Sequence, residues 1–173
     1  MSAADGLVRV LETIRSRHLA LPPATPEELE RLRSRSVPAD LVDFYSRTNG
    51  AGLHREEKYG ALREMAGAWW HWVVVPLCEM KTIQEIGYIQ PESPHYDRSK
   101  HWLGLVNVQD GNYLALSLEP GHAGEVIDCF HETVGAPGYS SIIALSFTEL
   151  MEQLVRSREA FWLQEGHRGY GVY

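Results

Sequence analysis

Hydrophobic residues recur every three or four positions near the start of the chain, which is the spacing of one face of a helix. This pattern predicts a helix over residues 5–18. The residues of its apolar face are Leu7, Val10, Leu11 and Ile14. A second helix is predicted to begin after Thr25, because Pro26 suits the first helical position and Glu28 can complete a capping box with Thr25.

The third helical pattern covers residues 41–48 and ends at Asn49-Gly50, two residue types that tolerate the left-handed conformation past a helix end. The positions at helical spacing are Leu41, Phe44, Tyr45 and Thr48. Residues 51–68 are rich in glycine and charge and show little periodicity. We therefore expect a loop or an irregular hairpin there.

The middle of the chain changes to aromatic and β-branched residues, which are typical of strands. Residues 69–77 predict a strand with both faces covered, and residues 126–131 and 142–145 predict two shorter ones. Residues 78–88 are expected to hold a short helix, followed by a proline-rich loop.

A hairpin is predicted where Asp110-Gly111 separates two apolar runs, at residues 101–108 and 113–118. Alternate positions of a strand face the same side of a sheet. The residues of the second run expected to face the core are Leu114, Leu116 and Leu118.

A C-terminal helix is predicted after Ser146, because Ser146 and Glu149 form a second capping-box pattern. The apolar stripe that follows spans four turns and consists of Phe147, Leu150, Met151, Leu154, Val155, Phe161 and Trp162. The predicted fold is therefore α+β, a single domain over residues 1–173. It has an antiparallel-dominated sheet of about five or six strands, with the N-terminal helices and the C-terminal helix packed on it.

Composition narrows the class of function. The chain has 173 residues, of which 44% are hydrophobic and 23% are charged, as is usual for a globular domain. Its formal net charge of -7 opposes nucleic-acid binding and favours encounter with a basic protein surface. Only Cys78 and Cys129 are present, and neither a signal peptide nor an 18-residue apolar run is visible. We expect a reduced, cytoplasmic protein that does not bind membranes, as a monomer or a homodimer.

No set of residues has the spacing of a known catalytic or metal site. His122, Asp128, His131 and Glu132 come nearest to a metal set, but Asp128 and His131 would point to opposite faces of a strand. Cys129 and His131 share a strand face, whereas catalytic Cys and His are normally brought together from distant segments. Phosphate-binding glycine motifs are absent from the sequence. We expect no catalytic residue, cofactor or metal.

Several short segments, in this order, resemble those of the SUKH superfamily. They are the Pro-Glu-Glu helix start, VPADLVDFYSRTNG, VVPL, DGNYLALSLEPGHAGEVIDCFHE and ALSFTELMEQLV. In the first long segment Pro38, Phe44, Tyr45, Asn49 and Gly50 occupy matching places. Asp110-Gly111-Asn112 replaces the family's more usual Gly-Asp arrangement. The resemblance extends over residues 25–155, and residues 156–173 have no clear counterpart.

The resemblance implies a protein that acts by binding another protein. The superfamily contains fungal cell-wall-assembly regulators and bacterial immunity proteins that neutralise toxins. An immunity protein that binds a toxin directly, such as a basic nuclease domain, is the first interpretation. A regulatory adaptor of the cell-wall-assembly type is the alternative, and an enzyme without a recognisable motif is a third.

The partner-binding face is predicted on two irregular, aromatic and acidic loops, around residues 55–59 and 88–101, because binding residues gather on loops held by a rigid scaffold. We also expect Trp70 or Trp72, whichever is exposed, to anchor the partner. The predicted residues are Glu56, Glu57, Tyr59, Trp70, Trp72, Tyr88, Glu92, Tyr96 and Asp97.

Overall fold

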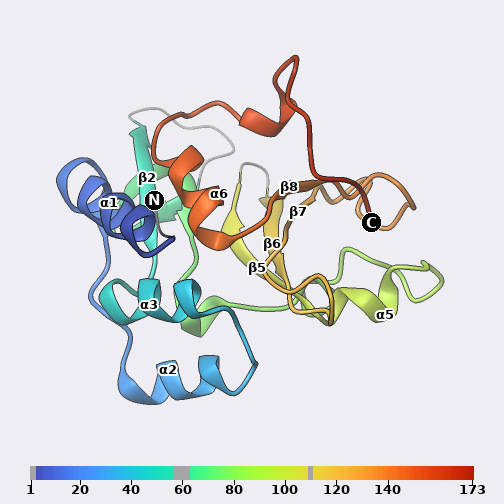
Figure 1. The fold of residues 1–173 in the computed structure, drawn as a ribbon, viewed down its shortest axis with the longest axis horizontal. Coiled ribbons are helices and arrows are strands. Elements are labelled where there is room, and N and C mark those ends of the chain that lie inside the picture. Colours follow the sequence, from blue (N-terminus) through green and yellow to red (C-terminus); the bar gives the residue numbers. More distant parts are fainter. Residues whose placement is uncertain (1–2, 57–62, 109–110) are drawn as a thin grey trace.

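The computed structural model describes residues 3–56, 63–108 and 111–173, and its helices and strands have the predicted α+β arrangement (Figure 1). The helices are α1 (Ala3–Arg17), α2 (Pro26–Arg33), α3 (Ala39–Arg47), α4 (Ile83–Ile86), α5 (Tyr96–Ser99) and α6 (Phe147–Leu154). Short 3-10 turns are η1 (Leu77–Glu79) and η3 (Phe161–Leu163). Helices α1, α3 and α6 pack against one another over one face of the sheet.

The sheet has eight strands within the described residues, and every pairing is antiparallel. The strands are β1 (Leu19–Ala20), β2 (Ala51–Glu56), β3 (Arg63–Met65), β4 (Ala68–Val74), β5 (Trp102–Asn107), β6 (Tyr113–Ser117), β7 (Val126–Cys129) and β8 (Ile142–Ala144). Their order is β1-β2-β4-β5-β6-β7-β8, with β3 paired to β4. The expected count of five or six strands was too small, because β1 and β3 are too short to show alternation.

The predicted hairpin is confirmed by the pairing of β5 with β6. Leu114 and Leu116 are fully buried, and Leu118 is half-buried against the same core. Gly111 has a φ of 79°, a value that suits glycine in a turn, whereas Asp110 lies outside the described residues. Ala115, on the other face of β6, packs in a second cluster with Trp102 and Ile127. Both faces of the central strands are therefore covered.

The helix starts agree with the sequence in part. Thr25 and Glu28 form the predicted capping box of α2. At α6 the Ser146 side chain accepts a hydrogen bond from the Glu149 N–H, but the Glu149 carboxylate accepts from the Leu145 N–H, so the second box is incomplete. The carboxylate of Asp40, on α3, accepts hydrogen bonds from the backbone and hydroxyl of Thr148. This contact ties α3 to the start of α6.

The C-terminal helix is shorter than predicted. Helix α6 ends at Leu154, so Phe161 and Trp162 do not continue its stripe but belong to η3. The chain leaves the helix where the Trp72 indole N–H donates to the Ser157 carbonyl, at 3.1 Å. Residues 51–68, expected to be a loop or an irregular hairpin, contain β2 and β3, which both pair antiparallel with β4, and His54 within β2 has a φ of 55°.

Close packing of β2 on β4 generates a prediction at Gly52. A Cβ atom added at Gly52 would lie closer than 3.0 Å to three atoms of the Trp70 ring. Gly52→Ala should therefore lower the free energy of unfolding by about 1–3 kcal/mol, measured by urea denaturation. Gly135→Ala is the matched control, since its Cβ would make only ordinary contacts with Ser93. If the two variants are equally stable, β2 can shift to accommodate the added methyl group without loss of stability, and the prediction is wrong.

Candidate partner-binding groove

The structure places Glu56 at the end of β2, where its carboxylate accepts a hydrogen bond from the Arg158 guanidinium at 2.7 Å. This ion pair joins β2 to the segment that follows α6. The charge of Glu56 is therefore partly neutralised within the protein. Glu57 and Tyr59 lie outside the described residues.

Trp70 and Trp72 are both buried, with 7% and 3% of their surfaces exposed. The expectation that one of them is exposed to anchor a partner is therefore wrong. The Trp70 indole N–H donates to the Met65 carbonyl, and the Trp72 ring packs against Trp162 with centroids 5.7 Å apart. Strand β3 thus covers the Trp70 ring, and the segment after α6 covers the Trp72 ring.

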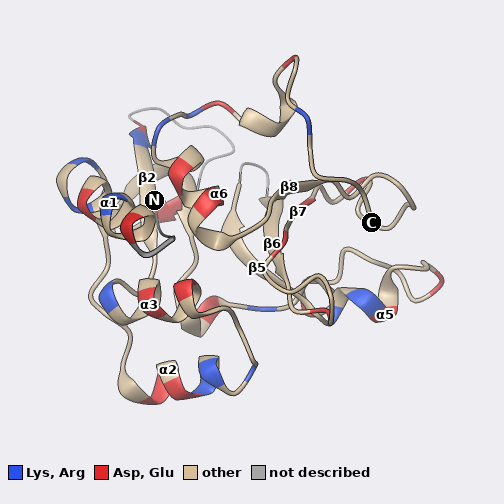
Figure 2. Cartoon of the chain, viewed as in Figure 1, with Lys and Arg blue, Asp and Glu red and all other residues tan. Residues whose placement is uncertain are grey.

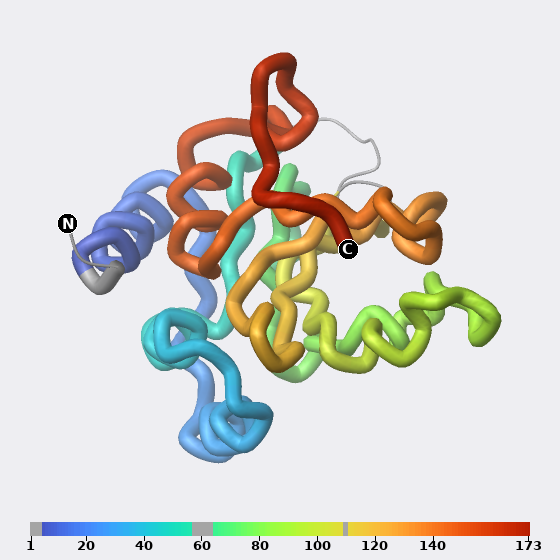
Figure 3. Tube along the Cα trace, turned by 45° about the vertical axis from the view of Figure 1, so that its right-hand side comes forward, coloured from blue at the N-terminus to red at the C-terminus, as the bar shows by residue number. Residues whose placement is uncertain are grey.

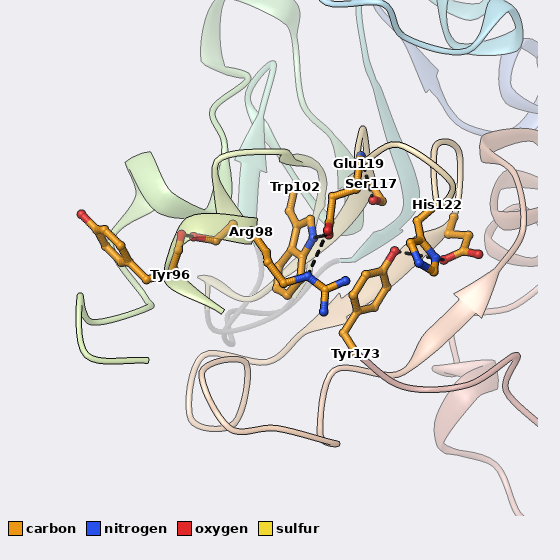
Figure 4. Close-up of polar contacts among 9 residues, drawn as sticks. Tyr96, Arg98, Trp102, Ser117, Glu119, His122 and Tyr173 are labelled. Carbon is orange, nitrogen blue, oxygen red and sulfur yellow. Dashed lines mark hydrogen bonds and ion pairs between the residues drawn. The ribbon is translucent and has the colours of Figure 1, made fainter. Parts of the chain in front are cut away.

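Tyr88, Glu92, Tyr96 and Asp97 lie together on the segment that includes α5. Glu92 and Asp97 are exposed, whereas Tyr88 is half-buried and its hydroxyl donates to the Gly111 carbonyl. The Tyr96 ring points away from the neighbouring polar cluster (Figure 4). Helix α5 and strand β2 lie on opposite sides of the molecule (Figures 1 and 3). The structure therefore does not bring the two predicted regions together.

Residues 156–173, called the tail below, run beside the sheet and end near β7 and β8 (Figure 3). The Tyr170 N–H donates to the Ile142 carbonyl, and the Ile142 N–H donates to the Gly171 carbonyl, both at 2.9 Å. Ser141 and Val172 form an antiparallel bridge. The tail thus adds backbone hydrogen bonds to β8, the last strand of the sheet.

Tyr173 anchors the tail in a polar cluster on the sheet face opposite helices α1, α3 and α6 (Figure 4). The Arg98 guanidinium lies 4.4 Å from the Tyr173 ring centroid, and the hydroxyl donates to Glu125 at 2.9 Å. Glu119 accepts hydrogen bonds from Arg98, at 2.9 Å, and from the Trp102 indole, at 2.6 Å. Burial raises the pKa of Tyr173. The tail is held as part of the fold.

A groove with a volume of about 620 Å³ lies between the sheet and the tail. It is lined by His71, Trp72, Val108, Asn112, Asp128, Phe130, Thr133, Tyr139, Ser141, Ala160, Trp162 and Leu163. Three of these residues are large and exposed: Phe130 by 37%, Tyr139 by 66% and Leu163 by 75%. Exposed apolar and aromatic residues around a concave surface are typical of a site that binds another molecule.

Asp128 is the charged residue of this groove. It pairs with Leu114 across β6 and β7, so its side chain lies on the helix-bearing face of the sheet. Its Oδ2 accepts a hydrogen bond from the Trp162 indole N–H at 2.9 Å, and burial raises the pKa of the carboxyl group. Burial also lowers the pKa of His71 below 6.5, so that this ring is neutral at neutral pH. Among the described residues that line the groove, Asp128 is thus the only one with a formal charge at neutral pH.

Sequence reasoning considered Asp128 only as a metal ligand and did not single out Phe130, Tyr139 or Leu163. The one signal in the sequence was a lone charge within an otherwise apolar strand, Val126–Cys129. The wall opposite comes from residues more than 30 positions later, a proximity that local spacing does not encode. The structure supplies that information.

The residues considered above as metal ligands or catalytic groups contact other side chains or are buried. His122 contacts Glu125 at 3.0 Å, and the backbone N–H and ring of His131 contact Asn112. Cys129 is fully buried, which raises its pKa and keeps it a thiol. Within residues 3–56, 63–108 and 111–173, no group of three or more His, Cys, Asp or Glu is placed to hold a metal ion. The same described part contains no helix with the length and apolarity needed to span a membrane.

The partly buried charge of Asp128 generates a prediction about stability and pH. At neutral pH Asp128→Asn should be at least as stable as the wild type, because the amide oxygen can still accept from Trp162 without a desolvated charge. The folded-state pKa of Asp128 is raised, so wild-type stability falls as pH rises through that pKa. The advantage of the variant should therefore grow from about pH 4 to about pH 7.

Urea unfolding at several pH values measures this difference, with exposed Asp97→Asn as the matched control. A wild type that is clearly more stable than Asp128→Asn at neutral pH would contradict the inferred cost of the buried charge.

Comparison with known proteins extends what the fold shows. Residues 22–153 match the model of the SMI1 / KNR4 family (SUKH-1). The chain is also 26% identical over 137 residues to a Bacillus subtilis (strain 168) protein named "Immunity protein YokJ", covering 78% of this chain and 75% of that relative. No solved structure gives a significant match. Because the family match spans most of the chain and agrees with the resemblance seen in the sequence, this protein belongs to the SMI1 / KNR4 family, SUKH-1.

Proposed function

We propose that this protein is an immunity protein, which neutralises a protein toxin by direct binding in the cytoplasm and without catalysis. The similarity to a relative named as an immunity protein is the observation that most supports it. Membership of the SUKH-1 family is consistent with the same role. The groove beside the tail is the surface best suited to the partner, since its exposed side chains are large and apolar.

The charge of the protein suits a basic partner. The formal net charge is -7, and acidic residues are spread over several elements, among them α2, α3, α5 and α6 (Figure 2). Exposed acids accelerate the encounter with a basic surface more than they prolong the bound state. Glu92 and Asp97 are exposed and remain proposed steering residues, whereas Glu56 already pairs with Arg158. Glu57 is retained in the proposal from its sequence alone.

The proposal predicts stoichiometric inhibition. The toxin to test is one encoded next to the gene for this protein, and its isolated toxic domain can be titrated with purified protein. Toxic activity should fall in proportion to the protein added and vanish near an equimolar ratio, because each molecule occludes one toxin. A stable complex should appear in size-exclusion chromatography. Inactivation by a small fraction of an equivalent would instead indicate catalysis, and an unaffected toxin would refute the immunity role for that pair.

The proposed steering residues generate a second prediction. Replacing Glu92 and Asp97 together with Lys should slow association with that toxin severalfold at low salt and less at high salt, because exposed charges are screened over about 8 Å at physiological ionic strength. The dissociation rate should change little. Stopped-flow fluorescence or surface plasmon resonance measures both rates.

The matched control replaces Glu12 and Glu30 with Lys. These acids are exposed on α1 and α2, away from α5, and the change in net charge is the same (Figure 1). If the two double variants slow association equally, the effect comes from net charge and α5 has no steering role.

A further inference from the structure

The groove combines an apolar, aromatic lining with one carboxylate. The aromatic side chains around Asp128 include Trp72, Phe130 and Trp162, and its other ionisable neighbour His71 is neutral at neutral pH. An ionised carboxylate in such surroundings lowers stability unless it is paired with a cation or fully hydrogen-bonded. No described Lys, Arg or His forms an ion pair with Asp128.

The hydrogen bonds of Asp128 leave half of its carboxylate available. Oδ2 accepts from the Trp162 indole, and the backbone N–H donates to the Ser141 carbonyl at 2.9 Å. No described residue donates a hydrogen bond to Oδ1. The backbone is fixed by pairing with β6, and the indole fixes the side chain. If the only role were to accept from Trp162, an asparagine would serve without the cost of the charge.

We propose that this groove receives an arginine or lysine side chain of the protein partner, with Asp128 as its counter-ion and the surrounding rings as its walls. This inference rests on the proposed function, because it specifies the toxin residue that the groove would hold. Aromatic faces attract cations, and a desolvated carboxylate pairs strongly with a guanidinium. The groove thus has both elements of a site for a basic side chain.

One wall of this site lies outside the part of the chain that the family model matches. Ala160, Trp162 and Leu163 form one wall of the groove, and all three lie after residue 153, where the family match ends. Asp128, Phe130 and Tyr139 lie within the match and form the opposite side. A scaffold within the family match is therefore completed by a segment that lies beyond it. Partner choice would then depend on the tail as well as on the acidic residue.

A peptide experiment tests the groove without the toxin. The probe is acetyl-Trp-Arg-Trp-amide, and the comparison is the same peptide with citrulline, which keeps the shape of arginine but has no charge. Binding is followed by NMR through the Trp162 indole N–H signal, assigned with Trp162→Phe. The arginine peptide should shift this signal and bind at least about 10-fold more tightly than the citrulline peptide.

Asp128→Asn should abolish the preference for arginine while leaving the fold intact, as judged by its NMR spectrum and its urea midpoint. Glu12→Gln, the same loss of charge at an exposed acid on α1, should keep the preference. Equal binding of the two peptides to the wild type, or no binding of the arginine peptide at about 1 mM, would overturn the inference. So would an unchanged preference in Asp128→Asn.

The toxin complex gives the second readout. Asp128→Asn should increase the dissociation rate of the complex at least about 10-fold, because loss of one member of a buried charge pair acts mainly on dissociation. If the wild type neutralises the toxin and Asp128→Asn does so with the same rates, the immunity role stands and the basic-residue site is wrong. If the peptide preference is found but no toxin is neutralised, the site stands and the proposed function fails.

Discussion

Coverage of the sheet is the constraint on which the rest of the structure depends. A sheet with apolar residues on both faces must be covered on both, and here Leu114 and Leu116 face the helices while Ala115 faces the second cluster. Helices α1, α3 and α6 cover only part of one face of the sheet. The groove, however, is lined by strands, turns and tail residues. It lies where the helical layer ends and a short irregular segment completes the cover.

That irregular segment explains why two tryptophans are tied to polar groups. Trp72 and Trp162 pack against each other, and each indole N–H needs an acceptor once it is buried. Trp72 uses the Ser157 carbonyl and Trp162 uses the Asp128 carboxylate. The first bond fixes where the tail leaves α6, and the second fixes η3 against β7. These two hydrogen bonds therefore hold the tail beside the groove.

Local patterns were sufficient to predict the fold class and most of the helices. Repeats at helical spacing and the Thr25 capping box located α1, α2 and α3 to within a few residues, because these signals are encoded by neighbours in sequence. Strands of two or three residues, such as β1 and β3, are too short to contain a period. The predicted C-terminal helix was too long because Phe161 and Trp162 fell at helical spacing by coincidence. A contact with Trp72, 85 positions away, decides where that segment turns.

The candidate site was less predictable for the same reason. One of Trp70 and Trp72 was expected to be exposed, but β3 and the tail cover both. Of the acids chosen from the sequence, Glu92 and Asp97 are exposed and Glu56 is paired. The acid that lies in the groove was set aside when a metal site was judged implausible. A buried charge is conspicuous only when its surroundings are known, because its cost depends on neighbours from distant parts of the chain.

Two kinds of acidic residue thus have separate physical roles in the proposed interaction. The exposed carboxylates of Glu92, before α5, and Asp97, on α5, act through a long-range field, which salt screens and which affects the rate of encounter. Asp128 acts only at contact, where low polarity strengthens the attraction to a cation and disfavours an uncharged substitute. The exposed carboxylates would attract any basic partner. Asp128, together with Trp162 and Leu163, would discriminate among such partners. Selectivity in this protein would therefore come from the few groove residues and not from the net charge.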